Sequence, residues 1–197
     1  RCEYHLSFPQ VFSHAGEVFM LPETQQTNRL EVWRATRFPL EWELHATALE
    51  GLLPADSCLY RQNGKWWLFS NLSDHHAFQE HSSALYLFQV SGPDLKQVIP
   101  HRFNPVVIGS DVSRNAGGLF IADGQLFRPS QNNSYGVYGY GLNLMRIDRM
   151  DEQDYGETLV RKITPADLKG ARGVHHVTFA QDKFVLDVYV NRPALAH

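Results

Sequence analysis

The feature of this sequence that most limits its fold is a hairpin pattern that occurs four times. In each copy an apolar stretch runs into a short polar turn and then into a second apolar stretch. The copies are Gln10–Leu21, Cys58–Phe69, Gly118–Pro129 and Val177–Val188. Their turns hold Ala15-Gly16, Asn63-Gly64, Asp123-Gly124 and Gln181-Asp182. Asn-Gly and Asp-Gly strongly indicate a two-residue β-hairpin, because a type I′ turn needs positive φ at both central residues.

The hairpins recur at intervals of roughly 50–60 residues, which is the repeat length typical of β-propeller blades. Further apolar stretches fill each interval. We expect third strands at Arg29–Thr36, Ala84–Val90 and Leu142–Ile147, and outer strands at Trp42–Leu49, Gln97–Pro100 and Thr158–Ile163. A β-sandwich also has many short strands. The repeated unit here is a whole multi-strand block, which favours the propeller.

The sequence therefore predicts an all-β fold with four visible propeller blades. We expect residues 1–197 to be a single β-propeller domain or a fragment of one, with blades at approximately 5–50, 54–108, 111–165 and 172–193. The chain begins with Arg1 and its first strand starts abruptly, so we expect a larger ring whose upstream blade is missing.

Composition excludes several classes of function. A formal net charge of −3 provides no basic field for nucleic acid. No apolar run is long enough to span a membrane, and residues 1–20 hold no signal-peptide pattern, so the compartment stays open with the cytoplasm slightly favoured. Cys2 and Cys58 are too few for a disulfide framework; we expect Cys58 to be buried, and one disulfide between them stays open.

We predict neither a cofactor nor a metal. The Gly/Tyr-rich segment Asn133–Gly141 lacks the dinucleotide fingerprint, and we interpret it as a substrate-lining loop or a plain connector. His75, His76 and His81 have no acidic or thiol partner at a fixed spacing.

Candidate site residues lie where the first strand of each unit begins, because that strand lines the central channel of a propeller. These stretches are His5–Pro9, Pro54–Ser57, Ser113–Gly117 and Gly173–His176. They carry His5, Asp56, Arg114, Asn115, His175 and His176. Polar groups that converge at a channel mouth indicate a binding site; the structural alternative is that they bridge neighbouring blades. Adjacent strand residues face opposite ways, so only one of the two histidines is expected to point into the channel.

A second polar set follows the second strands. It contains Glu23, Arg128, Gln131 and Asn132, with Tyr138 in the loop beyond. Glu23 and Asp56 are candidate catalytic residues, since glycoside hydrolysis uses a pair of carboxylates about 5–10 Å apart. The others suit the recognition of hydroxyl or phosphate groups. We expect Arg114 to hold Asp56 in its charged form. One of Trp66 and Trp67 is expected in the core.

The ordered motifs resemble the N-terminal propeller domain of glucosamine inositolphosphorylceramide transferases. They are His5–Pro9, Gly16–Thr24, Asp56, Lys65–Phe69, Asn104-Pro105, Arg114 with Ala116-Gly117, Arg128–Gln131 and Tyr138-Gly139. The resemblance covers about residues 4–187. It implies a five-bladed ring similar to arabinanase- and furanosidase-type glycosidases, a sugar or glycoconjugate ligand, and a fused or neighbouring transferase domain. The chain departs from the pattern by beginning after an Ala-Asp-Pro-Phe-like blade, and it has Arg114-Asn115 where the glycosidases place a general-acid Glu.

Three hypotheses follow. The first is a carbohydrate-recognising propeller associated with a glycan-modifying transferase. The second is a glycosidase-like hydrolase that uses Asp56 and Glu23. The third is a non-catalytic protein-interaction propeller.

Overall fold

The computed structural model describes residues 3–73, 80–180 and 183–190. In this part of the chain the strands form four separate sheets. The first sheet contains β1 (Ser7–His14), β2 (Glu17–Glu23), β3 (Leu30–Arg37) and β4 (Glu41–Ala48). The second contains β5 (Leu53–Gln62), β6 (Lys65–Ser73), β7 (Ala84–Val90), β8 (Val98–Pro100) and β9 (Val107–Ile108), the last paired with β7.

The third sheet contains β10 (Phe120–Ala122), β11 (Gln125–Asn132), β12 (Gly141–Met150) and β13 (Tyr155–Ile163). The fourth contains β14 (Ala171–Ala180) and β15 (Lys183–Val190). Short 3₁₀ turns are η1 (Gln25–Thr27), η2 (Ser134–Gly136) and η3 (Pro165–Asp167). No helix in the described residues is long and apolar enough to cross a membrane.

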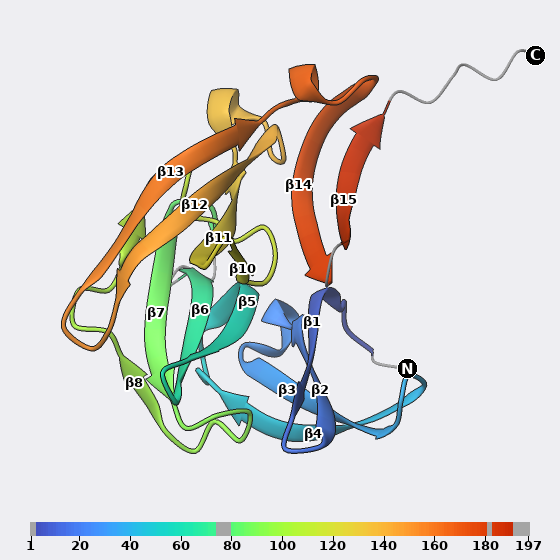
Figure 1. The fold of residues 1–197 in the computed structure, drawn as a ribbon. Helices are drawn as coiled ribbons and strands as arrows, with labels where there is room; N and C mark the ends of the chain where they lie inside the picture. The colour runs from blue at the N-terminus through green and yellow to red at the C-terminus, as the bar shows by residue number, and fades with distance from the viewer. Residues whose placement is uncertain (1–2, 74–79, 181–182, 191–197) are drawn as a thin grey trace, which may run out of the picture.

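The hairpin prediction is confirmed, because each predicted hairpin begins a different sheet. The four pairs are β1-β2, β5-β6, β10-β11 and β14-β15. The predicted third strands correspond to β3, β7 and β12, and the predicted outer strands to β4, β8 and β13. Figure 1 shows the sheets arranged around one centre. A sandwich would place two hairpins in one continuous sheet, so the fold is an all-β propeller.

The turn chemistry follows the sequence. Asn63 and Gly64 have φ of 51° and 80°, and the Ala15-Gly16 and Asp123-Gly124 turns likewise have positive φ at both residues. These values fit type I′ hairpins, which match the right-handed twist of the strands. The predicted turn at Gln181-Asp182 lies outside the described residues.

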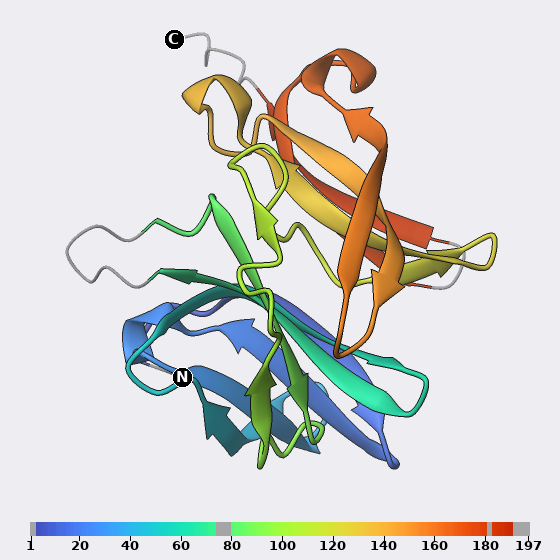
Figure 2. The same cartoon turned by 90° about the vertical axis from the view of Figure 1, so that its left-hand side faces the viewer.

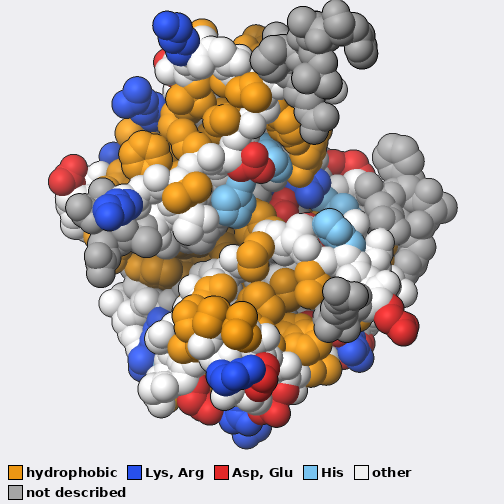
Figure 3. Space-filling view, turned by 90° about the vertical axis from the view of Figure 1, so that its right-hand side faces the viewer, with side chains coloured by type: hydrophobic (Ala, Val, Ile, Leu, Met, Phe, Trp, Pro, Cys, Tyr) orange, Lys and Arg blue, Asp and Glu red, His pale blue; other side chains and the backbone are white. Residues whose placement is uncertain are grey.

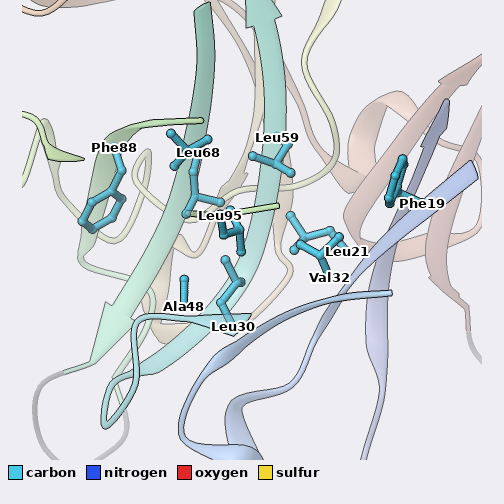
Figure 4. Close-up of a cluster of buried hydrophobic side chains, with 10 residues drawn as sticks. Phe19, Leu21, Leu30, Val32, Ala48, Leu59, Leu68, Phe88 and Leu95 are labelled. Atoms are coloured by element: carbon cyan, nitrogen blue, oxygen red, sulfur yellow. The ribbon is translucent and has the colours of Figure 1, made fainter. Parts of the chain in front are cut away.

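The hydrophobic core consists of clusters between neighbouring sheets. The largest joins the first and second sheets and includes Leu21, Val32, Leu59 and Leu68, with the other side chains drawn in Figure 4. A second cluster, around Phe69, joins the second and third sheets, and a third includes Leu142 of the third sheet and Val174 and Val177 of the fourth. Cys58 is a free, buried thiol in the second cluster, as expected, and Cys2 lies outside the described residues. Packing of this kind fixes each sheet through its neighbours.

Hydrogen bonds also link the sheets near the centre. The side-chain amide of Gln10 donates to the Leu59 carbonyl at 2.8 Å and accepts from the Leu59 N–H at 2.7 Å, which joins β1 to β5. The Val177 N–H donates to the Ala116 carbonyl at 2.8 Å, which joins β14 to the segment before β10. Figure 2 shows the first two sheets below and the third and fourth above. The first strands of all four sheets therefore converge where candidate site residues were predicted.

Candidate functional site

A cavity of about 480 Å³ lies where the innermost strands of the four sheets converge. Its lining residues come from all four sheets and the segments beside them. They are His5, Ser7, Phe8, Pro9, Glu23, Asp56, Arg114, Gln131, Tyr138, His175, His176 and Asp187. Figure 3 shows histidine, acidic and basic side chains gathered in a hollow between the two halves of the molecule. Eight of the eleven candidate residues named from the sequence therefore line one cavity.

Asp56 is the most strongly held polar side chain of this cavity. It is 4% exposed, and its carboxylate accepts a 2.5 Å hydrogen bond from Nε of Arg114. Nε2 of Gln131 donates to the same oxygen at 3.3 Å. Its main-chain N–H donates to Oε2 of Glu23 at 3.3 Å. Three sheets thus meet at one carboxyl group.

The protonation of Asp56 differs from the sequence expectation. Burial raises the pKa of the Asp56 carboxyl to about 7, and the negative charge of Glu23 adds to this by repulsion. Arg114 lowers the pKa, as the sequence suggested, but the desolvation of a fully enclosed carboxylate outweighs its charge. Arg114 thus favours the charged form as expected, but with a pKa of about 7 Asp56 is only partly ionised near neutral pH.

The contact between Glu23 and Asp56 limits what this pair does chemically. Glycosidase carboxylates stand about 5–10 Å apart, so that the sugar and, in inverting enzymes, a water fit between them. Here Oε2 of Glu23 accepts from the main-chain N–H of Asp56 at 3.3 Å, which places Glu23 directly beside Asp56.

Irregular strand geometry aims several side chains into the cavity. The pairing register shifts between Ser7 and Gln10, between Ala55 and Cys58, and between Val174 and His176. Phe8 and Asp56, which lie within the first two shifts, have φ of 47° and 45°. β-Bulges bend a strand and redirect its side chains.

The bulge in β14 corrects one sequence expectation. Strict alternation predicts that only one of His175 and His176 faces the channel, yet both line the cavity. His176 pairs with Asp187 while Val174 pairs with Val188, so His175 is the extra residue of the bulge. Alternation fails there because two residues of β14 oppose one residue of β15.

His175 forms an aromatic wall with two tyrosines. Its ring stacks on Tyr189 with centroids 5.3 Å apart and lies 5.5 Å from the ring of Tyr138. Nδ1 lies 3.4 Å from a carboxylate oxygen of Asp187. Burial lowers the pKa of His175, with Asp187 acting against it, so the imidazole is neutral at pH 7. The guanidinium of Arg114 lies over the ring of Tyr138, with Cζ 5.0 Å from the ring centroid.

Three predicted substrate-binding residues lie away from the cavity lining. Arg128 is fully buried and pairs with both carboxylate oxygens of Glu157 at 2.9 and 2.6 Å. Asn115 is fully buried, and its amide donates to the Asp56 carbonyl at 2.8 Å. Asn132 accepts from the Ser134 N–H at 3.0 Å. Arg128 thus ties β11 to β13 within the third sheet, and Asn115 ties the segment before β10 to the second sheet. Asn132 braces the loop that follows β11.

The two tryptophans also lie apart from the cavity. Trp67 is 2% exposed in the core, as expected for one of the pair, and Trp66 packs on Phe12 and His14. His75 and His76 lie outside the described residues. Within those residues no group of three or more His, Cys, Asp and Glu side chains could hold a metal ion.

Sequence reasoning missed four lining residues. Three of them, Ser7, Phe8 and Pro9, lie within the strand starts considered above and were passed over because their types are apolar or small. Asp187 lies in β15, outside any predicted strand start, and reaches the cavity because it pairs with the bulged segment of β14. A signal for Phe8 exists in the sequence, since it precedes its hairpin glycine by the same number of residues as Asp56.

Comparison with known sequences gives a consistent family assignment. A family model described as glucosamine inositolphosphorylceramide transferase 1, N-terminal, matches residues 1–181. Glucosamine inositolphosphorylceramide transferase 1 of Oryza sativa subsp. japonica is 37% identical over 160 residues, which is 80% of this chain and 21% of that protein. The Arabidopsis thaliana protein of the same name is 34% identical over 169 residues, 85% of this chain and 22% of that protein. The chain thus spans about a fifth of the length of these relatives.

Solved structures with a similar fold are carbohydrate-active enzymes of low sequence identity. An exo-β-1,3-galactanase from Phanerochaete chrysosporium, crystallised with β-1,3-galactotriose, superposes with a TM-score of 0.62 at 8% identity, over 96% of this chain and 44% of that one. An α-L-arabinanase mutant from Cellvibrio cellulosa gives a TM-score of 0.58 at 14% identity, over 92% and 68% of the two chains. At these identities the likeness concerns the fold alone.

Proposed function

Because this chain belongs to the family of glucosamine inositolphosphorylceramide transferase 1 N-terminal domains, we propose that it is the carbohydrate-recognising propeller of a glycan-modifying transferase. Membership of this family supports a glycan-related function. In this proposal the central cavity holds a sugar, and a fused or neighbouring domain performs the transfer.

The observation that carries the proposal is a buried acceptor with no partner. Gln131 is 1% exposed, and its Nε2 donates to the Asn115 carbonyl at 3.1 Å, which fixes the orientation of the amide. The other amide atom, Oε1, has no hydrogen-bond partner among the described residues. Leaving such a group unpaired costs about 1–3 kcal/mol, so a ligand donor that reaches it gains this much. A sugar hydroxyl is such a donor.

The remaining groups suit a polyhydroxylated ring. Asp56 and Glu23 offer carboxyl oxygens that accept from hydroxyls, and Arg114 offers further N–H donors. Tyr138 and His175 present aromatic surface for the apolar face of a sugar. His5 is exposed at the rim. A propeller that only binds other proteins does not need charged, partly enclosed groups of this kind. We therefore rank the protein-interaction hypothesis last.

Sugar binding by the Asp56→Asn variant tests the proposal. The probes are D-glucosamine, N-acetyl-D-glucosamine, L-arabinose and D-galactose, titrated by NMR chemical-shift changes. We expect at least one probe to bind and the variant to bind it about tenfold or more weakly, because Asn presents one acceptor oxygen where Asp presents two. The matched control is Asp148→Asn, the same change at an exposed carboxylate outside the cavity.

Two outcomes would contradict the proposal. One is the absence of binding to every probe by the unaltered protein. The other is unchanged binding in Asp56→Asn together with a large drop in melting temperature, which would make Asp56 a purely structural residue.

A hydrolase is the second candidate, and one observation favours it. Asp56 with a pKa of about 7 retains a proton near neutral pH, as a general acid requires. Against it, Glu23 is held directly beside Asp56 by the main-chain N–H of Asp56, whereas the carboxylates of a glycosidase pair stand on either side of the scissile bond. Release of 4-nitrophenol from 4-nitrophenyl α-L-arabinofuranoside or β-D-galactoside, abolished by Asp56→Asn, would favour the hydrolase over the binding module.

A further inference from the structure

We propose that a second sugar subsite continues from the central cavity across Tyr138, and that Asn133 and Tyr135 bind a further unit of the glycan there. The inference rests on the proposed carbohydrate-binding function and extends it from a single sugar to an oligosaccharide.

The subsite is a groove of about 610 Å³ between the second and third sheets. Its walls come from the segments before β7 and before β10 and from the loop between β11 and β12. The lining residues are Ser82, Ser110, Asp111, Asn133, Ser134, Tyr135, Gly136 and Tyr138. Tyr138 lines the central cavity as well. The two hollows therefore share one aromatic side chain, beside which a chain of sugar units would pass from the cavity into the groove.

Asn133 gives the groove a buried donor that nothing in the described structure satisfies. It is 8% exposed, its main-chain N–H donates to the Ser110 carbonyl at 3.2 Å, and its Oδ1 accepts from the Gly139 N–H at 2.7 Å. A backbone N–H only donates, so the atom that faces Gly139 is the oxygen and the remaining atom is the NH₂ group. This group, Nδ2, has no partner among the described residues. A ligand oxygen in the groove would satisfy it.

Tyr135 gives the groove an aromatic platform. It is 86% exposed and has φ of 61°, a backbone conformation that aromatic residues seldom adopt. Its ring meets Tyr140 edge-on, with centroids 5.3 Å apart and an interplanar angle of 82°. The turn is braced by Asn132, which accepts from the Ser134 N–H. A backbone conformation of this kind costs of the order of 1–3 kcal/mol, and here it keeps the ring of Tyr135 exposed. Strained residues of this kind are concentrated at ligand-binding sites.

The charge of the groove selects the class of ligand. Asp111 is the one charged side chain among the lining residues, and the others supply hydroxyl, amide and aromatic groups. The groove has no Lys or Arg to neutralise a phosphate or carboxylate, in contrast to the central cavity with Arg114. The groove therefore fits a neutral or amino sugar and disfavours an anionic group.

The test compares ligands of two lengths against two groove variants. The probes are D-galactose with β-1,3-galactotriose and L-arabinose with arabinotriose, and affinities are measured by calorimetry. We expect a trisaccharide to bind more tightly than its monosaccharide. Tyr135→Ala should weaken trisaccharide binding roughly tenfold, the size of one aromatic contact, and leave monosaccharide binding unchanged. Asn133→Asp, which keeps the oxygen that faces Gly139, should do the same.

Tyr135→Phe is the matched control, because it keeps the ring, and should retain full affinity for the trisaccharide. Equal affinity for the two lengths in the unaltered protein, or unchanged trisaccharide binding in Tyr135→Ala, would overturn the second subsite while leaving the central site intact. Binding of no saccharide at all would overturn both the subsite and the proposed function. A melting temperature close to that of the unaltered protein shows that any loss arises at the groove.

Discussion

At the scale of single residues, the cavity depends on opposing effects on one carboxyl group. Burial removes water from Asp56 and favours its neutral form, whereas Arg114 favours its charged form. Arg128 shows the contrast. It is also buried, but its bidentate pair with Glu157 and its hydrogen bonds to Val112, Ser113 and Asn115 satisfy the guanidinium within the protein. A buried group thus marks a binding site only where its partners leave an atom free for a ligand, as Gln131 does.

The raised pKa of Asp56 predicts how stability depends on pH. Its pKa is about 7 in the folded chain and about 3.9 in an unfolded one, so folding favours the protonated form. The stabilisation from this residue is therefore complete below about pH 4 and is lost as the pH rises through about 7. Asn at position 56 stays neutral and lacks this dependence. Urea denaturation at intervals from pH 4 to 8 should show Asp56→Asn gaining stability relative to the unaltered protein, by up to a few kcal/mol. A pH-independent difference would contradict the raised pKa.

At the scale of elements, the first strands of three of the four sheets are irregularly paired where they line the cavity. β1, β5 and β14 each contain a register shift at a cavity residue. The strands behind them carry the packing: β6 contributes Trp67, Leu68 and Phe69 to the core. The sheets therefore combine an irregular inner edge with a regular, buried middle.

The fourth sheet should be the least protected against hydrogen exchange. In the described part of the chain β15 pairs only with β14, and Phe184, Val185 and Val190 are at least 60% exposed. Few buried apolar contacts mean a low free energy of local opening. We expect amides of β14 and β15 to exchange faster than those of β6 and β7, measured by mass spectrometry of deuterated peptides. Equal protection in the two pairs would show that the fourth sheet opens only with the whole fold.

At the scale of the whole molecule, the fold is held together between sheets as much as within them. The fourth sheet packs closely against Gly117, where an added Cβ would lie 2.0 Å from the Val177 carbonyl oxygen. The hydrogen bond from the Val177 N–H to the Ala116 carbonyl lies beside this contact. The position of His175 and His176 against Arg114 therefore depends on glycine at this point.

Gly117→Ala should separate the third and fourth sheets. The added methyl collides with backbone, and φ of 146° is strained for alanine. We expect a loss of at least about 2 kcal/mol in the free energy of unfolding and weaker sugar binding, because the cavity loses its fourth wall. The neighbouring Gly118→Ala is the control, since its Cβ would lie 3.5 Å from Gln10 Nε2, an ordinary contact. Equal stability of the two variants, measured by thermal denaturation, would contradict this account.

The hairpins, the strand order and most of the cavity were predictable from the sequence. Turn residues such as Asn63-Gly64 determine the conformation of their own hairpin, and apolar stretches indicate which strands are buried. The strands and their repetition can therefore be predicted from residues that are neighbours in the sequence. The repeat then placed Asp56, Arg114 and His175 at equivalent strand starts, and the symmetry of a propeller directs equivalent positions to one centre. Local chemistry combined with repetition was sufficient for this part of the structure.

The tertiary structure alone decided which polar residues stay available to a ligand. Arg128 and Gln131 lie three residues apart on β11, yet one is fully paired and the other has a free oxygen, because Glu157 comes from β13 of the same sheet. The bulge that brings both His175 and His176 to the cavity, and Asp187 with them, depends on pairing with β15. The pKa of Asp56 depends on its enclosure by three sheets. Each of these properties is a balance between groups far apart in sequence, and such a balance exists only after the sheets have packed.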